Sequence, residues 1–365
     1  MHKIQLSYAL GASPAAAQGI RNPLIELLQA VRTQGSISAA ARELGQSYRH
    51  VWGELRRWEA ELGRGLIVWD KGQPARLSPF GEKLLWAERQ AQARLAPQVA
   101  ALHADLERVF AVAFDDQAQV LTLYASHDEG IAALREHAAA SRLHLDVRFT
   151  GSVDAISALN EGRCTLAGFH APPSPAPGTL AQRSYQPLLK PGLHKIIGFA
   201  RRQQGLLVAR GNPLGLQSLS DVYAAQARYV NRALGTGTRL LAEQLLNDAG
   251  LAPAGLNGWD HVEPSHAAVA QAIVSGAADA GLGIEAAAHR HGLGFVPLLE
   301  EDYFLVCLKS ALEEPAMRTL RQVLAQPQWQ ARIALLPGYR PRRSGEVLSL
   351  SQELPWWRFA KDRNA

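Results

Sequence analysis

Hydroxyl side chains and glycines recur together at the starts of predicted helices in the second half of the chain. Ser126 ends a predicted strand, Gly151-Ser152 opens a predicted helix, and Gly235-Thr-Gly-Thr238 precedes another. Glycines let a ligand approach the backbone closely, and the free N–H groups of a helix start favour negative charge. Hydroxyl groups can donate hydrogen bonds to the oxygens of an anion. These loops therefore predict a binding site for a small oxyanion.

The predicted ligand site includes charged and aromatic groups as well. Either Arg232 or Arg239 would add a charge-assisted bond to an anion. His266 either contacts the ligand or caps the helix that follows it. Each Ser or Thr also fits an ordinary helix cap, so the prediction depends on the loops meeting in one cleft. The predicted ligand-binding residues are Ser126, Gly151, Ser152, Arg232, Thr236, Gly237, Thr238, Arg239 and His266.

Catalysis is not predicted from these residues. Ser126, His127 and Asp128 are adjacent, so their side chains would leave one turn in different directions and could not act as nucleophile, base and orienting group. His170 is isolated from any evident partner. The loop at 235–238 lacks the lysine of a P-loop, which argues against nucleotide hydrolysis. We expect a binding protein and not an enzyme, with no metal and no cofactor, and with a small anion as effector.

A different chemistry is indicated near the N-terminus. Two short predicted helices meet at Gly45, the first with a face of small residues and capped by Ser38, the second basic and capped by Ser47. An apolar stripe from Val51 to Trp58 would hold the second helix against a core. Its basic first turn would then be free to meet base edges and phosphates in a major groove. This helix-turn-helix predicts DNA binding.

Elements on both sides would complete the DNA-binding unit. A support helix is predicted over 24–31, and two short strands over 66–77 would form a wing around a turn at 71–74. Another short strand is predicted from Ile4 to Leu10, beside the wing. Lys71 and Arg76 would reach backbone phosphate. The predicted DNA contacts are Ser36, Ser47, Tyr48, Arg49, His50, Arg56, Lys71 and Arg76.

A long helical pattern follows the wing. It begins at Ser78-Pro79 and continues to Val109, with Pro97 expected to kink or divide it. An apolar stripe of that length beside a small domain indicates a dimerisation helix. Pairing would set two recognition helices about 34 Å apart, one turn of DNA. We expect a homodimer or a dimer of dimers.

Short motifs in the first third of the chain carry a family resemblance. They are Gly35-Ser-Ile-Ser-Ala-Ala-Ala41, Ser47-Tyr48, Val51-Trp52, Leu62-Gly63 and Leu77-Ser-Pro-Phe-Gly-Glu82. Together they resemble the winged helix of ModE-like and LysR-type bacterial regulators, and the Ser47-Tyr-Arg-His-Val-Trp52 variant favours the ModE-like side. The resemblance implies a transcription regulator that binds double-stranded operator DNA.

Composition describes a well-cored chain of two or three domains. The chain has 365 residues, of which 47% are hydrophobic and 19% charged. The formal net charge of +5 is modest, so affinity for nucleic acid must come from a local basic patch. Cys164 and Cys307 lack partners at ligand spacing and are expected to be core thiols. No apolar run approaches the ~20 residues of a membrane span, and no signal-peptide core is evident, so a cytoplasmic protein is expected.

From Val120 onward, predicted strands and helices alternate. Strands over 120–125, 145–149 and 165–169 are separated by helices, and a second unit repeats the rhythm between Leu206 and Gly283 before strands over 295–308 return to the first. This alternation predicts a parallel sheet with binding loops at the carboxyl ends of its strands.

The second half resembles the periplasmic-binding-protein-like domains that serve as ligand sensors in bacterial regulators. Crossings between two lobes are expected near 197–206 and 291–295. The segments 231–239, 263–266 and 276–286 resemble the branch related to molybdate-binding proteins. The resemblance implies molybdate or tungstate as the first candidate ligand. A small carboxylate or another metabolite is the alternative, and a solute-binding transport component or an enzyme is a more remote one.

The predicted fold class is α/β with an N-terminal winged-helix domain. Its parts are a winged helix-turn-helix over 1–85, a linker and dimerisation helix over 86–117, a two-lobed ligand-binding domain over 118–345 with its second lobe at about 200–292, and a tail over 346–365. Arginines 340, 342 and 343 precede Leu354-Pro-Trp-Trp-Arg358. This region either touches DNA or packs its tryptophans onto the sensor, and the second interpretation is favoured.

Overall fold

The computed structural model describes residues 22–69 and 74–357. The chain divides into two compact units, Met1–Val99 and Ala100–Ala365, which are described separately. The predicted strand from Ile4 to Leu10 and the predicted phosphate contact Lys71 lie outside the described residues.

Three helices and a two-stranded wing make up most of the described part of the first unit. They are α1 (Pro23–Gln34), α2 (Ile37–Glu43), α3 (Tyr48–Leu62), β1 (Ile67–Val68) and β2 (Arg76–Leu77), with β1 antiparallel to β2. Gly45 adopts a φ of +65°, a left-handed conformation that glycine permits at low cost and that turns the chain between α2 and α3. The predicted helix-turn-helix and wing are both present.

Capping in the first unit differs from the prediction at one position. Ser36, and not Ser38, caps α2, since its hydroxyl accepts from the Ala39 N–H at 3.4 Å. Ser36 has the extended backbone of a cap residue, whereas Ser38 lies inside the helix. Ser47 caps α3 as predicted and accepts from the His50 N–H at 3.2 Å.

Small and branched apolar side chains hold the first unit together. Leu28, Val31 and Val51 are fully buried, and Ala40, also fully buried, lets α2 approach its neighbours closely. The amphipathic pattern read from the sequence therefore coincides with this core.

The wing leads into the long helix α4 (Pro79–Phe114). The Ser78 hydroxyl accepts from the Gly81 N–H at 3.0 Å and closes the first turn. Pro97 lies inside the helix and does not divide it. The boundary between the two units falls within α4, between Val99 and Ala100.

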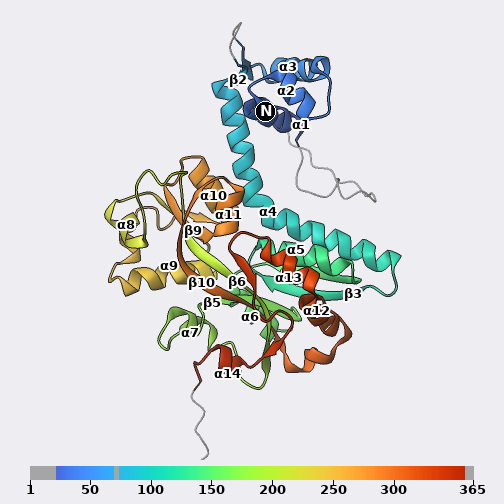
Figure 1. Cartoon of the computed structure of the whole chain (residues 1–365), viewed down its shortest axis with the longest axis vertical. Helices are drawn as coiled ribbons and strands as arrows, with labels where there is room; N and C mark the ends of the chain where they lie inside the picture. The colour runs from blue at the N-terminus through green and yellow to red at the C-terminus, as the bar shows by residue number, and fades with distance from the viewer. Residues whose placement is uncertain (1–21, 70–73, 358–365) are drawn as a thin grey trace, which may run out of the picture. The chain divides into compact units, whose positions relative to one another are not determined.

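A single ten-stranded sheet runs through the second unit, in the order β4-β3-β5-β10-β6-β9-β7-β8, with β11 and β12 pairing with β6. Figure 1 shows helices covering this sheet. Its elements are β3 (Gln119–Ala125), α5 (Glu129–Ala139), β4 (Leu143–Phe149), α6 (Ser152–Asn160), β5 (Leu166–Ala171), α7 (Leu180–Tyr185), β6 (His194–Val208), α8 (Leu219–Ala224), β7 (Tyr229–Arg232), α9 (Gly237–Asp248), β8 (Val262–Glu263), α10 (His266–Val274), β9 (Ala280–Ile284), α11 (Glu285–Arg290), β10 (Gly294–Leu308), α12 (Pro315–Ala325), α13 (Pro327–Ala334), β11 (Tyr339–Pro341), β12 (Val347–Leu348) and α14 (Leu350–Glu353).

The sequence predicted a parallel sheet, but the observed sheet is mixed, with both parallel and antiparallel pairs of strands. Strands within each lobe are parallel, as in β3 with β4 and β7 with β9. The long strands β6 and β10 run antiparallel to each other and to their other neighbours, β9 and β5. They continue from one lobe into the other and are the two predicted crossings, so the lobes are joined by a pair of hydrogen-bonded strands.

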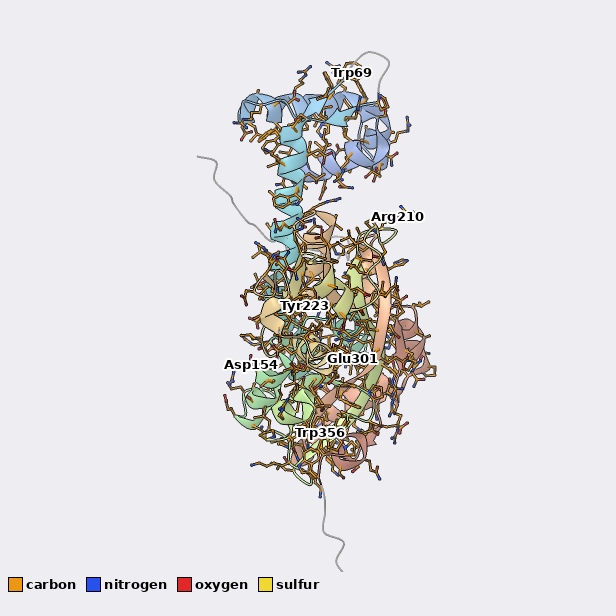
Figure 2. All side chains as sticks on the ribbon, turned by 90° about the vertical axis from the view of Figure 1, so that its left-hand side faces the viewer. Trp69, Asp154, Arg210, Tyr223, Glu301 and Trp356 are labelled. Atoms are coloured by element: carbon orange, nitrogen blue, oxygen red, sulfur yellow. The ribbon has the colours of Figure 1, made fainter. Side chains whose placement is uncertain are left out.

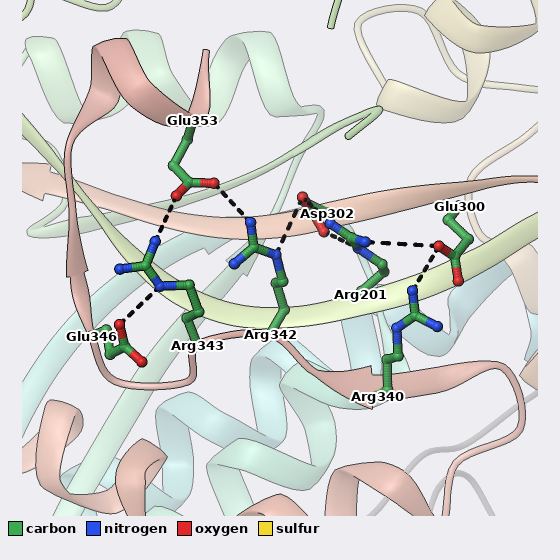
Figure 3. A network of polar contacts seen from close by, with 8 residues as sticks. All are labelled: Arg201, Glu300, Asp302, Arg340, Arg342, Arg343, Glu346 and Glu353. Carbon is green, nitrogen blue, oxygen red and sulfur yellow. Dashed lines mark hydrogen bonds and ion pairs between the residues drawn. The ribbon is translucent and has the colours of Figure 1, made fainter. Parts of the chain in front are cut away.

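The C-terminal segment packs on the first lobe. Leu354 and Trp356 are buried in the cluster that contains Tyr185, and the Trp356 indole donates to the Pro175 carbonyl at 3.2 Å. The neighbouring arginines are held by carboxylates: Arg342 and Arg343 each bond to Glu353 at 3.0 Å (Figure 3). The predicted packing of this tail on the sensor is confirmed for the residues up to 357.

Both cysteines, Cys164 and Cys307, are buried free thiols, as expected. Within residues 22–69 and 74–357, no helix is both long and apolar enough to cross a membrane.

Candidate functional site

The loops that carry the predicted ligand residues meet between the two lobes. A Cβ placed on Gly151, before α6 of the first lobe, would lie 2.8 Å from the carbonyl oxygen of Gly235 in the second lobe. The Val153 N–H donates to the same carbonyl at 3.4 Å. The lobes are therefore in contact at the place where the sequence pattern put a cleft.

The start of α6 offers free donors at this contact. Gly151 stands at the cap position and has no side chain to satisfy the first turn. Ser152 is fully buried, and its hydroxyl has no hydrogen-bond partner among the described residues. By contrast, α5 is capped by Asp128 and α9 by Thr236. Because buried polar groups are normally paired, the Ser152 hydroxyl is a candidate for contact with a ligand.

Arg232 supplies a buried positive charge that no described carboxylate neutralises by an ion pair. Its side chain is 2% exposed, and one terminal nitrogen donates weakly to the Glu263 backbone carbonyl at 3.4 Å. Its Nε has no hydrogen-bond partner in the part of the chain that the structure describes. Burial, with a smaller contribution from the nearby Arg202, lowers the pKa of Arg232 to about 9. A buried guanidinium without a counter-ion is costly, and an anion would offset that cost.

Arg202 is also buried in the second unit, but unlike Arg232 it forms ion pairs with carboxylates. Its guanidinium bonds to Glu301 at 2.6 Å and also to Asp128, whose carboxylate in turn accepts from the Tyr339 hydroxyl. Burial lowers the pKa of Arg202, but Glu301, Tyr339 and Asp128 together outweigh burial and raise that pKa well above its ordinary value. Of these two buried arginines, only Arg232 lacks such partners.

Three histidines around Arg232 are held neutral. Burial, followed by the positive charge of Arg232, lowers the pKa of His127 to about 4. The pKa values of His170 and His266 are lowered well below the usual range, mainly by burial and then by the two arginines. Neutral imidazoles can offer either a donor or an acceptor to a ligand.

Two expectations about these histidines change. Ser265 caps α10, so His266 does not fill that role. The Nδ1 atom of His266 has no hydrogen-bond partner within residues 22–69 and 74–357 and can contact a ligand. His170 is not isolated in space, because its ring lies 3.8 Å from that of Tyr303 and its Cβ would be 3.2 Å from a Cβ at Gly237.

Other predicted ligand residues are engaged within the protein. The Ser126 hydroxyl donates to the Thr150 carbonyl at 3.2 Å, and that of Thr236 donates to Ala233 at 2.7 Å while capping α9. Thr238 accepts from Gln204 at 3.0 Å. Arg239 bonds to Glu243 at 3.0 Å and lies 3.7 Å above the Trp259 ring, so of the two predicted arginines only Arg232 is uncommitted.

Several residues of the site escaped the sequence patterns. Tyr185 and Tyr303 are fully buried, and neither their hydroxyls nor the side-chain carbonyl oxygen of Gln204 has a hydrogen-bond partner among the residues that the structure describes. They come from α7, β10 and β6, which are distant in the sequence and come together only in the folded structure. No short motif could have identified them. Among the described residues, no group of three or more His, Cys, Asp or Glu side chains could hold a metal ion.

The first unit presents an exposed polar surface at the start of α3. Tyr48, Arg49 and His50 are all exposed, and Tyr48 stacks on Trp52 with ring centroids 6.3 Å apart. Arg76 is also exposed, on the wing strand β2. Of the other predicted contacts, Ser36 and Ser47 serve as caps, and Arg56 bonds to Glu59 at 3.3 Å.

Trp69 on the wing was missed by the sequence patterns. Its side chain, labelled in Figure 2, is 60% exposed. Its ring lies 5.7 Å from that of Trp52, a contact that connects the wing to α3. An exposed tryptophan after a strand was the available signal.

Comparison with protein families identifies the second unit. Residues 133–325, more than half of the chain, match the PBP superfamily domain. The chain belongs to the PBP superfamily. Residues 24–82 match the helix-turn-helix of bacterial regulatory proteins of the lysR family. This PBP-superfamily chain therefore has the domain composition of a LysR-type transcription regulator, and that class is not enzymatic.

Individual relatives of this PBP-superfamily chain are distant. YvgK of Bacillus subtilis (strain 168), an uncharacterized protein, is 29% identical over 201 residues, which cover 55% of the chain and 64% of YvgK. An uncharacterized protein from the ferredoxin 2Fe-2S gene 5' region of Clostridium pasteurianum is 25% identical over 111 residues, 30% of the chain and 98% of that protein. The hydrogen-peroxide-bound structure of an OxyR mutant from Corynebacterium glutamicum is 17% identical, with a TM-score of 0.40 over 84% of the chain and 95% of OxyR.

Proposed function

We propose that the protein is a one-component regulator that acts in the cytoplasm, binds operator DNA through its first unit and senses a small anion between the lobes of its second. The observation that carries the sensing proposal is Arg232, a buried guanidinium for which the described residues supply no ion-pair partner. The Ser152 hydroxyl, also buried and without a partner among those residues, follows the glycine that contacts the loop at Gly235. Apart from this effector, the function needs no cofactor.

Molybdate or tungstate is the first candidate effector. The resemblance of the sensor to molybdate-binding proteins and the ModE-like variant of the recognition helix both favour it. A small carboxylate is the second candidate, because a guanidinium, a hydroxyl and helix N–H groups accept either kind of oxygen anion.

Closure of the lobes would carry the signal to DNA. An effector shifts a conformational equilibrium only by its differential affinity for the two states, typically about 1 to 3 kcal/mol of coupling. The exposed apolar side chains on α4, among them Leu95, Leu102 and Val109, fit a pairing surface for a second copy. A homodimer, or a dimer of dimers, would place two recognition helices on a two-fold operator.

Thermal unfolding against a panel of anions tests the sensing proposal. A ligand at 100 times its Kd stabilises the folded state by about 2.7 kcal/mol. The panel is molybdate, tungstate, sulfate, phosphate, formate and acetate. A selective rise in Tm supports an anion sensor and identifies its class, whereas no rise with any of them contradicts the anion site.

Operator binding is tested separately, by fluorescence anisotropy with the upstream DNA of the protein's own gene. Binding that weakens steeply with salt and changes on addition of the stabilising anion is expected. If the anion does not change the operator affinity, ligand binding in the second unit does not control DNA binding by the first, and the proposed regulation is wrong.

A further inference from the structure

A small hollow opens beside the proposed anion site, between α7 of the first lobe and α9 of the second. Its volume is about 50 Å³, and its apolar wall includes Pro172, Ala181, Leu240 and Leu299. Since one water needs roughly 10 to 15 Å³ on this measure, the hollow has room for a few groups of that size. Neither Arg232 nor Ser152 lines the hollow, so a bare oxyanion held by those two side chains would leave this space unfilled.

The inner end of the hollow is polar. It is lined by His170, Tyr185 and Glu301, each at most 3% exposed. His170 Nε2 and the Tyr185 hydroxyl lack hydrogen-bond partners among the described residues. A buried, unpartnered pair of this kind is expected where a ligand atom belongs.

Glu301 makes this end of the hollow favour a ligand group that donates a hydrogen bond. Arg202 and Gln204 both bond to Oε1 of its carboxylate, at 2.6 and 2.9 Å, whereas no described residue donates a hydrogen bond to Oε2. A carboxylate oxygen only accepts hydrogen bonds. The group that fills the hollow must therefore donate one, and a second anionic group would be repelled.

One residue of the predicted anion loop, Gly237, also lines the hollow: a Cβ there would lie 3.2 Å from the His170 Cβ and 3.6 Å from the Tyr185 hydroxyl. Burial raises the pKa of Tyr185, and the neighbouring Ser152 hydroxyl partly opposes that rise. No hydrogen bond of regular geometry joins these two hydroxyls. Gly237, the first residue of α9, lines the hollow and leaves it open because it has no side chain.

We propose that the effector is an organic acid with a short arm ending in a hydroxyl or ammonium group: the acid binds Arg232 and Ser152, and the arm fills the hollow and donates to Glu301. This inference rests on the proposed anion sensor and selects among its candidate ligands.

Matched pairs of acids test the arm. The Kd values of acetate, propionate and butyrate are measured by calorimetry on the full chain and compared with those of their ω-hydroxy and ω-amino derivatives, with molybdate and sulfate alongside. At one chain length, the derivative should bind at least tenfold more tightly than its parent acid. If parents and derivatives bind equally, or if only inorganic oxyanions bind, the proposal that the effector carries a donor arm is wrong. The proposal that the protein senses an anion is not affected by that result.

Two variants at one position localise the effect. Ala181→Phe fills the hollow and should remove the advantage of the derivative while the parent acid keeps its affinity; Ala181→Ser, of nearly equal volume, should preserve that advantage. An advantage that survives Ala181→Phe in a folded variant places the arm elsewhere and overturns the inference. If no anion of any class binds the wild-type chain, that result contradicts both the proposed anion sensor and the proposed donor arm of its effector.

Discussion

Gly151 and Gly235 touch across the two lobes: a Cβ at Gly151 would come within 2.8 Å of the Gly235 carbonyl oxygen and 2.9 Å of its carbon. Both atoms belong to backbone, so they cannot move aside as a flexible side chain can. The lobes approach this closely because residue 151 has no side chain. Its φ of −67° is accessible to any residue, so the requirement is one of space and not of backbone conformation.

Gly151→Ala should therefore hinder closure without unfolding the first lobe. We expect at least a tenfold rise in the Kd of whichever anion stabilises the wild-type protein, with basal DNA binding unchanged. Calorimetry measures the Kd and anisotropy the DNA affinity. Ser157→Ala, more than one turn further along the same helix, is the control. Wild-type affinity in Gly151→Ala would show that this contact does not accompany ligand binding.

Arg232→Met should separate ligand binding from stability. The substitution removes a buried charge that has no ion-pair partner, so the free energy of unfolding without ligand should stay the same or rise by about 1 kcal/mol. Anion binding should be lost. Urea unfolding and calorimetry check the two effects. A large loss of stability would mean that Arg232 is a structural residue and not an anion receptor.

The elements of both units could largely be predicted because each has a local signal. The caps, the Gly45 turn and the apolar stripe from Val51 to Leu55 reflect interactions within a few residues of each other. The choice of Ser36 over Ser38 as a cap could not be made, since both serines fit the spacing and only the backbone conformation separates them.

The candidate site was only partly predictable. Ser152 and Arg232 were found because they adjoin a helix start and a glycine loop, but the same logic selected Ser126 and Arg239, whose polar atoms are used inside the protein. Glu301 could not be found, because its role depends on the antiparallel pairing of β6 with β10, which the alternating pattern did not reveal.

Acid should destabilise the sensor through its neutral histidines. The pKa of His127 is lowered from 6.5 to about 4, so between those pH values the unfolded chain binds a proton that the folded chain does not. Stability from this group is therefore lost as pH falls from about 6.5 to 4, by up to about 1.4 kcal/mol per pH unit. Urea unfolding at several pH values should show a smaller slope in His127→Asn than in wild type. Parallel curves would contradict the assignment.

Arg49 should contribute to DNA binding without contributing to folding. It is exposed in the first turn of α3, whereas Arg57 on the same helix bonds to Glu54 at 2.5 Å. Arg49→Ala should weaken operator binding about tenfold and reduce the salt slope by about 1 if it contacts a phosphate. Arg57→Ala is the matched control and should change both less. If the two substitutions have equal effects, the assignment of α3 as the recognition helix is wrong.

Trp356 should matter for stability and not for DNA. Its ring is 5% exposed in the cluster with Tyr185, and its indole and its carbonyl both form hydrogen bonds, to Pro175 and from Gln186. Trp356→Ala should lower the free energy of unfolding by roughly 3 to 5 kcal/mol. Trp357→Ala, at a less buried position, should cost less. Because Tyr185 also lines the hollow, Trp356→Ala should weaken binding of the stabilising anion as well, while operator affinity of the folded fraction stays at the wild-type value. A loss of operator affinity with unchanged stability would instead make this segment part of the DNA interface.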